Sequence, residues 1–244
     1  MKIGTYLRIV PEMSSVLSGN YFSSPYGISE LQLDALSSSV LETSLNLKDK
    51  LNCSLTAFSC ASKAAIDELT RVKMFGVDKC YLFETNAAPD VLQEAKICAD
   101  FMRNYDIDIL LVGANFEYMH FSTIAPLISS ISTLPYVENV RGISVIDNML
   151  NAVYESYRGA VKIKTIPQKC IISYCGKDLL RYPILKNRLN ASNSDIEINH
   201  VNYDNNNYNI EKVNFTENKI IENSVDNLAT SVLDIFREKG VIQL

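Results

Sequence analysis

The chain has 244 residues, 47% of them hydrophobic and 21% charged, which is enough to bury a full core as one large α/β domain with an appended arm. Its net charge of −5 and the lack of any Lys/Arg cluster exclude nucleic acid and anionic membranes as expected partners, because both need a concentrated positive face. No apolar run approaches the roughly 18 residues that span a bilayer, and the start lacks the apolar block of a signal peptide. We therefore expect a cytoplasmic protein, or a mature organellar one, without membrane insertion.

The predicted elements of the first half alternate between strand and helix. The apolar, β-branched run from Ile3 to Val10 predicts a first strand that stops at Pro11, because proline cannot donate to a ladder. The pattern then predicts a helix over 31–51, a strand over 53–60, a helix over 62–75 with Ser62 as N-cap and Gly76 as stop, a strand over 80–83, a helix opened by Pro89, and a strand over 107–112 before a helical pattern from Ile124. This alternation favours a mostly parallel sheet with helices on both faces.

The second half has a different character. After Pro135 three alternating segments, 140–146, 152–157 and 160–166, predict antiparallel strands added to the parallel core, and residues 170–174 predict one more buried strand. Beyond Asn190 the chain is rich in Asn and Asp and too poor in apolar residues to build a core. We expect an α/β domain over 1–190 and an extended C-terminal arm over 191–244. The arm ends in a helix over 224–239, whose apolar stripe docks either on its own domain or on a partner chain.

Six cysteines are spread along the chain without a CxxC spacing, and four of them fall within apolar segments. Reduced, buried thiols are therefore expected in place of disulfides or an iron–sulfur cluster. No metal-ligand spacing surrounds His120, and His200 lies in the polar arm. No Ser/His/Asp or Cys/His set can be proposed either, so we predict no catalytic residues and no metal site.

The segment from Gly113 to Pro126 carries the main functional signal. It follows a buried strand, leaves it through a glycine, and then brings hydroxyls and free backbone N–H groups to a helix start. That arrangement is a common nucleotide-phosphate site in parallel α/β proteins. The loop is the first candidate for function.

Motifs along nearly the whole chain resemble the small (β) subunit of the electron transfer flavoproteins. Each motif is weak alone, but their order and spacing together make chance similarity improbable. They are Lys2-Ile3 with Arg8-Ile9-Val10-Pro11-Glu12, Leu41-Glu42 with Leu45-Asn46-Leu47-Lys48, the run from Leu55 to Cys60, Phe75-Gly76-Val77-Asp78, Arg181-Tyr182-Pro183 with Leu185, and the run from Phe236 to Val241.

The resemblance implies a Rossmann-like domain within a heterodimer. In that family the α subunit carries most contacts to a redox FAD, and the β subunit holds AMP, or a second FAD in the bifurcating members. Its C-terminal arm wraps the α subunit. Such a complex passes electrons from a flavin dehydrogenase, such as one of the acyl-CoA type, to a downstream acceptor, and the cofactor carries the chemistry. The alternative is a non-redox subunit that keeps the fold for adenine-nucleotide binding or as a scaffold.

The resemblance also implies the site residues, although the loop departs from the family pattern. Asn115 stands at a glutamine position, Tyr118 and His120 stand at two aspartates, Thr123 at a second glutamine and Ala125 at a glycine. Either the backbone N–H groups keep a nucleotide, or aromatic side chains fill the site. The expected nucleotide contacts are Tyr6, Leu7, Asp34, Ala35, Ser37, Cys60, Gly113, Ala114, Asn115, Phe116, Tyr118, His120, Phe121, Ser122, Thr123 and Ile124. Tyr6 and Cys60 also fit plain core residues, and Ser37 an N-cap.

The segment from Arg181 to Leu189 is similar to the family's recognition loop, in which a leucine inserts into a pocket of the partner dehydrogenase. Leu185 holds the place of that leucine. Lys186 and Arg188 replace the usual proline and isoleucine, so this loop is more basic. We expect these three residues to dock on the partner, with a helical turn packed on its own domain as the alternative.

Overall fold

The computed structural model describes residues 1–11, 31–85, 90–114, 123–146, 149–155, 161–192 and 196–201. Its largest sheet consists of β1 (Lys2–Tyr6), β4 (Ser54–Ala61), β5 (Lys79–Glu84), β6 (Ile109–Gly113), β7 (Tyr136–Val140), β11 (Cys170–Tyr174) and β12 (Glu197–His200). The strands lie in the order β12-β5-β4-β1-β6-β11-β7, and all neighbouring pairs are parallel. β6 and β11 are buried along their whole length, because continuous apolar runs suit strands that are covered on both faces.

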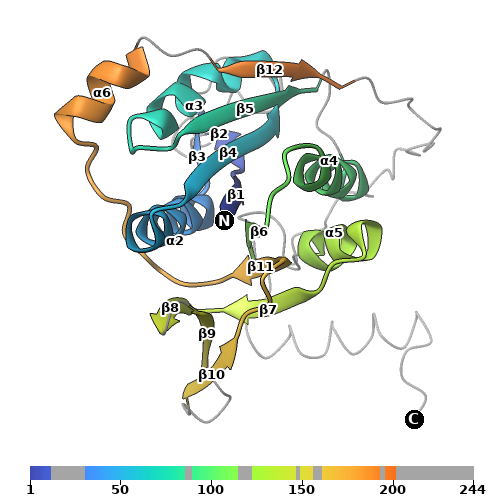
Figure 1. Ribbon diagram of the computed structural model, residues 1–244. Coiled ribbons are helices and arrows are strands. Elements are labelled where there is room, and N and C mark those ends of the chain that lie inside the picture. Colours follow the sequence, from blue (N-terminus) through green and yellow to red (C-terminus); the bar gives the residue numbers. More distant parts are fainter. Residues whose placement is uncertain are drawn as a thin grey trace, which may run out of the picture. The chain divides into compact units, whose positions relative to one another are not determined.

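Helices cover both faces of this sheet (Figure 1). α2 (Ala35–Leu51) and α3 (Ile66–Lys73), which follows the short 3₁₀ turn η1 (Lys63–Ala65), pack on one face. α4 (Val91–Asn104) and α5 (Ile124–Ser132) pack on the other and contact each other. The apolar spacing of Val91, Ala95, Cys98 and Met102 predicts α4; the last three are buried in the second cluster, and Val91 is partly buried against it. The expected α/β fold, with a mostly parallel sheet between two helical layers, is confirmed.

Two small antiparallel sheets complete the described part. β8 (Gly142–Ile146), β9 (Met149–Glu155) and β10 (Val161–Thr165) form a three-stranded sheet in the order β10-β9-β8. Leu150 and Ala152 on its inner face join the core beside α2 and β11. These strands match the antiparallel additions predicted after Pro135. β2 (Ile9–Pro11) and β3 (Leu31–Leu33) form a short ribbon.

Several expected boundaries are corrected near the N-terminus. The predicted single strand from Ile3 to Val10 is two strands, because the backbone leaves the large sheet after β1 and β2 pairs with β3. The helix predicted over 31–51 begins only after Asp34, which caps α2, and the apolar residues before it form β3. Ser62 does precede a helical turn, but its side chain makes no capping hydrogen bond. Gly76 follows α3 with φ +104, a conformation that favours glycine.

Two strands were not predicted, and one helix was expected only as an alternative helical turn. β7 lies just before the alternating segments and joins the parallel sheet beside β11. α6 (Leu185–Ser192) contacts α3. β12, whose residues the sequence assigns to the start of the arm, pairs with β5 at the edge of the sheet. The expected helix over 224–239 lies outside the described residues, and the division at residue 190 stays a prediction.

Candidate functional site

The candidate site lies at the carboxyl ends of β1 and β6, where the chain changes its direction of progress across the sheet. β4 and β5 succeed β1 on one side, and β6 then pairs with β1 on the other. The Leu7 N–H donates to Phe58 O at 2.9 Å, and the Ala114 N–H donates to Tyr174 O at 2.8 Å, so backbone pairing continues to the rim. Open parallel sheets bind ligands in the crevice at such a switch point.

Asp34 starts α2 and caps it with its own carboxylate. Its Oδ2 accepts hydrogen bonds from the N–H groups of Leu36 at 3.0 Å and Ser37 at 3.2 Å. The Ser37 hydroxyl instead accepts from the Arg8 N–H at 2.9 Å, which ties α2 to the second residue after β1. Asp34, and not Ser37, is therefore the N-cap. Because this carboxylate already occupies the first donors of α2, that helix start does not fit a phosphate.

Within the described residues, α5 starts without such a cap. Thr123 precedes it in a helical conformation, is exposed, and makes no side-chain capping hydrogen bond. Ile124 is buried among the residues beneath α4 and α5. The first N–H groups of an uncapped helix, together with its dipole, attract anions. Of these two helix starts near the switch point, α5 is the one that fits a phosphate.

The other predicted nucleotide contacts divide into two groups. Gly113 and Ala114 are buried at the carboxyl end of β6, Leu7 is buried on the α2 side of the sheet, and Ala35 is exposed at the start of α2. The second group lies outside the described residues, and its role stays a prediction. It comprises Asn115, Phe116, Tyr118, His120, Phe121 and Ser122.

Tyr6 and Cys60 lie on the α4 side of the sheet, close to the Glu94 carboxyl and the Arg8 guanidinium. Arg8 Nη2 is 3.6 Å from Glu94 Oε1, and only 5% of the Glu94 side chain is exposed. Burial raises the pKa of Tyr6 and of Cys60 well above their usual values, and the Glu94 carboxyl raises both further. Burial also raises the pKa of Glu94, and the positive charge of the Arg8 guanidinium partly lowers it again. A thiol held protonated in this way is a poor nucleophile.

Arg8 and Glu94 are the two site residues that the sequence reading missed. Glu94 stands three residues after Val91 and four before Cys98, inside the apolar stripe of α4. A carboxylate in such a stripe is a signal for a buried charge that needs a partner. Arg8 belongs to a motif that resembles the family, and it is the second residue after β1. Both signals are present in the sequence.

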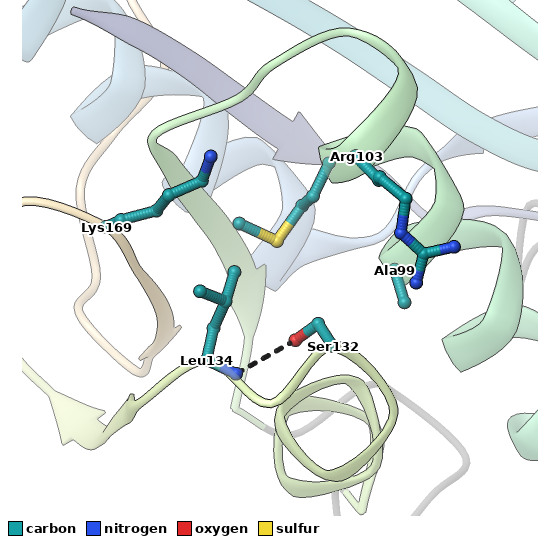
Figure 2. A pocket seen from close by; sticks show the side chains of 6 residues that line it. Ala99, Arg103, Ser132, Leu134 and Lys169 are labelled. Atoms are coloured by element: carbon teal, nitrogen blue, oxygen red, sulfur yellow. Dashed lines mark hydrogen bonds between the residues drawn. The ribbon is translucent and has the colours of Figure 1, made fainter.

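A separate cavity of about 160 Å³ lies at the opposite, amino-terminal end of the sheet (Figure 2). Arg103 at the end of α4 and Lys169 before β11 line it, beside Ser132 and Leu134. Its cations pair with nearby carboxylates: Arg103 with Asp100, and Lys169 with an aspartate at the same end of the sheet. Helix C-termini, which carry partial negative charge, also face this end. This cavity is not a second phosphate site.

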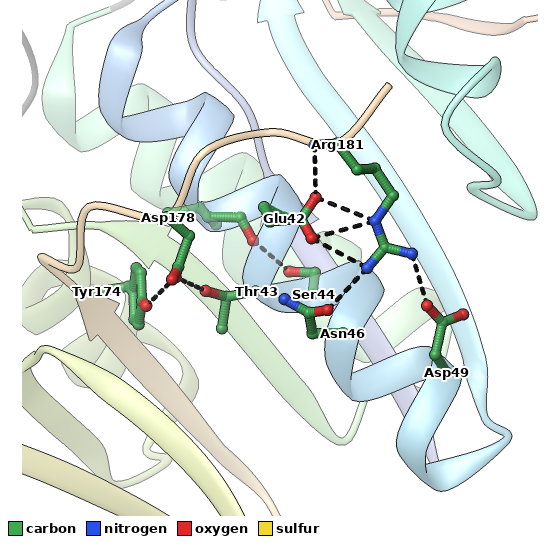
Figure 3. Close-up of polar contacts among 9 residues, drawn as sticks. Glu42, Thr43, Ser44, Asn46, Asp49, Tyr174, Asp178 and Arg181 are labelled. Atoms are coloured by element: carbon green, nitrogen blue, oxygen red, sulfur yellow. Dashed lines mark hydrogen bonds and ion pairs between the residues drawn. The ribbon is translucent and has the colours of Figure 1, made fainter. Parts of the chain in front are cut away.

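The segment after β11 is fastened to α2 by a polar network (Figure 3). Ser39 Oγ donates to Gly176 O at 2.9 Å and accepts from the Asp178 N–H at 2.8 Å. The Tyr174 and Thr43 hydroxyls both donate to the Asp178 carboxylate. The strand exit is therefore held at several successive turns of one helix.

Arg181 continues this network along α2. Its guanidinium contacts Glu42, Asn46 and Asp49, which are spaced four and three residues apart and so share one helix face. Hydrogen bonds to Glu42 and Asp49 raise the pKa of Arg181 against the effect of burial. The residues around this anchor are open to solvent, with Leu179 92% and Tyr182 94% exposed.

The predicted docking residues lie at the start of α6. Leu185 is its first residue and is 71% exposed, and Lys186 and Arg188 are exposed as well. The alternative of a helical turn is thus right for the backbone, but the Leu185 side chain does not pack into its own domain. Docking on a partner stays a prediction.

Among the described residues, no group of three His, Cys, Asp or Glu side chains is arranged to hold a metal ion. None of the described helices combines the length and apolar character needed to cross a membrane.

Comparison with known families agrees with this geometry. A family model for the electron transfer flavoprotein domain matches residues 29–176, which is more than half of the chain. The matched range runs from just before β3 to just after β11 and so includes both helix starts discussed above. No curated protein matches the chain. The chain belongs to the electron transfer flavoprotein family.

Proposed function

We propose that the chain is the small (β) subunit of a heterodimeric electron transfer flavoprotein. In that complex an α subunit holds most of an FAD, and electrons pass from a flavin dehydrogenase to a downstream acceptor. The flavin supplies the electron transfer when bound. This chain contributes a nucleotide-binding site at the carboxyl ends of β1 and β6, which holds AMP or a second FAD. It also contributes a docking loop for the dehydrogenase.

The observation that carries this proposal is the uncapped start of α5 beside the switch point. Within the described residues, no side-chain cap from Thr123 occupies the first N–H groups of α5, the helix that follows the loop leaving Gly113 and Ala114. These groups are suited to the phosphate of an adenine nucleotide. They act through the backbone, so the changed side chains of the loop do not remove them.

The remaining rim residues suit the rest of the nucleotide. Asp34 blocks a phosphate at α2, where Ala35 is exposed and could contact the nucleoside, whereas Ser37 is buried with its hydroxyl bonded to the Arg8 N–H. Arg8 adds one cation at the carboxyl end of β1, where its charge balances Glu94. The protonated Tyr6 and Cys60 beneath the rim provide no nucleophile, which suits a carrier in which the cofactor performs the chemistry.

The test is to co-express the chain with its α subunit, purify the complex, and identify the nucleotides that denaturation releases. One FAD with AMP indicates an ordinary carrier, and two FAD indicate a bifurcating one. AMP without flavin would favour the non-redox alternative. A complex without flavin contradicts the proposal.

A variant pair locates the phosphate. Thr123→Asp places a carboxylate at the N-cap of α5, where it competes with a phosphate for the same donors. We expect this variant to lose AMP while its fold is retained. Ser62→Asp makes the same change at another helical start without a side-chain cap, and it should leave the AMP content unchanged. Equal AMP content in both variants would place the phosphate elsewhere.

A further inference from the structure

The outer face of the three-stranded sheet carries exposed apolar side chains. Directly paired residues of antiparallel strands share a face, and alternate residues of one strand do too. Ile146 is paired with Met149, and Ile163 is paired with Val153, so these four residues and Val161 lie on one face. Ile146 is 47%, Met149 52%, Val161 65% and Ile163 60% exposed.

The inner face of the same sheet is already used. Leu150 and Ala152 are buried in the core, and Ile143, Val145 and Tyr154 pack against it. The outer-face residues lie on the side of the sheet that points away from this core and do not contribute to it. A cluster of exposed apolar side chains on one sheet face typically marks an interaction surface.

Within the described residues, β10 has one edge that pairs with no other strand. It lies at the edge of the three-stranded sheet and pairs with β9 (Figure 1). All five of its residues are exposed. An edge strand presents a row of backbone N–H and C=O groups that an extended segment of another chain can pair with. β10 thus offers both apolar side chains and backbone hydrogen bonds.

The charge of β10 determines which partner fits. Lys162 and Lys164 alternate with the two apolar residues, and neither forms an ion pair within the described part of the chain. Lysines on an edge oppose pairing with a copy of the same strand. Antiparallel pairing about a twofold axis at Ile163 would set Lys162 opposite Lys164 twice, and like charges directly opposite each other destabilise a sheet. An acidic partner strand gains from the same lysines.

We propose that the β10 edge and the outer face of β8–β10 form a binding surface for the α subunit. The α subunit contributes an extended segment with apolar and acidic residues. This inference rests on the proposed function, because it assigns a surface to the partner named there. The segment pairs with the β10 backbone, covers Val161 and Ile163, and places its carboxylates near Lys162 and Lys164.

The test measures the affinity of the purified α subunit for full-length variants of this chain. Lys162→Glu/Lys164→Glu should weaken binding about tenfold or more and slow association, because charge complementarity acts mainly on the encounter rate. Lys50→Glu/Lys79→Glu makes the same charge change at two exposed lysines on other elements, and we expect it to stay within about twofold of the unaltered chain. Val161→Thr/Ile163→Thr keeps the β-branched shape that suits a strand, and it should also weaken binding.

Hydrogen exchange on the unaltered complex gives a second, mutation-independent measurement. The amides of residues 161–165 should exchange more slowly with the α subunit than without it. If all variants bind the α subunit with equal affinity and the β10 amides exchange at unchanged rates, the proposed binding surface is wrong, although the heterodimer itself still stands. If the unaltered chain does not bind the α subunit, both the proposed function and the proposed binding surface are wrong. A homodimer that Val161→Thr/Ile163→Thr dissociates would assign the face to a second copy and overturn the proposal.

Discussion

Arg181 and Glu42 are 139 positions apart in the chain, yet the Glu42 carboxylate accepts hydrogen bonds from both the side chain and the backbone of Arg181. The Arg181 Nε–H lies 3.1 Å from both carboxylate oxygens of Glu42, and the Arg181 backbone N–H donates to Oε2 at 3.0 Å. Glu42 exposes only 10% of its side chain, whereas Arg181 exposes 31%. The contact fixes the end of the segment that leaves β11 before the chain enters α6.

Arg181→Met should destabilise the protein by about 1–2 kcal/mol, because it leaves the Glu42 carboxylate buried without its cation. This is less than the loss for a fully buried pair, since water screens the partly exposed Arg181. Arg103→Met is the matched control, because its partner Asp100 is 60% exposed, and it should cost no more than about 0.5 kcal/mol. Urea unfolding of both variants gives the comparison. Similar losses for the two would show that the Glu42 contact contributes nothing special.

Glu94 should make stability depend on pH in an unusual direction. Burial raises its pKa, so the folded chain binds that proton more tightly than the unfolded chain does. The stabilisation is complete below the unfolded-state pKa and is lost as the pH rises through the folded-state pKa. Glu94→Gln imitates the protonated form without titrating. Its stability relative to the unaltered chain should therefore increase as the pH rises from about 4 to 8.

Thermal unfolding of the Glu94→Gln variant and the unaltered chain across that pH range tests the expectation. Glu138→Gln, which changes an exposed carboxylate on β7, serves as the control. A difference between Glu94→Gln and the unaltered chain that stays constant with pH would contradict it.

The sequence was sufficient for the elements that carry their own periodicity. The stripe of Ala95, Cys98 and Met102 predicted α4, and the continuous apolar runs predicted β6 and β11. β12 has no such pattern, and its strand conformation is seen only in its pairing with β5. Local propensity cannot reveal that pairing, because the stabilising partner lies more than a hundred residues away.

The candidate site divides along the same line. Cys60, Gly113 and Thr123 could be located because the first two lie at the carboxyl ends of β4 and β6 and the third precedes α5, and parallel strands place such positions at one rim. The cap at Asp34 could not be separated from Ser37, because the apolar residues before α2 continue its helical pattern although they form β3. The Arg181 network had no local signal, since its partners are gathered only when α2 packs beside the exit of β11.

Gly4 occupies a point on β1 where a side chain does not fit. A Cβ there would lie 2.9 Å from Ile107 Cγ2 and 3.3 Å from Leu110 Cδ1. Gly4→Ala should therefore destabilise the chain by about 1–3 kcal/mol through overpacking. Ile107→Ala removes the closest atom, so the double variant should lose less than the sum of the two single variants. Additive losses in urea unfolding would show that Ile107 is not the obstacle.

The cysteines should differ in reactivity according to their burial. Burial raises the pKa of Cys80 to about 12 and that of Cys170 to about 12, and it raises those of Cys60 and Cys98 as well. Cys53 and Cys175 are only half-buried. We expect iodoacetamide to label these two first in the folded chain, and peptide mass spectrometry resolves the six sites. In urea all six should react alike; uniform labelling without urea would contradict the buried assignment.

Leu185 tests the docking loop without disturbing the fold. Because its side chain is 71% exposed at the start of α6, Leu185→Ala should leave both the unfolding free energy and the flavin content of the complex unchanged. If the leucine inserts into a pocket of the dehydrogenase, its loss should remove about 2 kcal/mol of docking free energy, a roughly thirtyfold rise in KM for reduction of the complex. Leu92→Ala truncates another exposed leucine, on α4, and should leave KM unchanged. Reduction kinetics with a flavin dehydrogenase distinguish the two, and an unchanged KM for Leu185→Ala would reject Leu185 as the contact. In that event Leu179 and Tyr182, which flank the Arg181 contact in the sequence and are more exposed than Leu185, become the next residues to truncate.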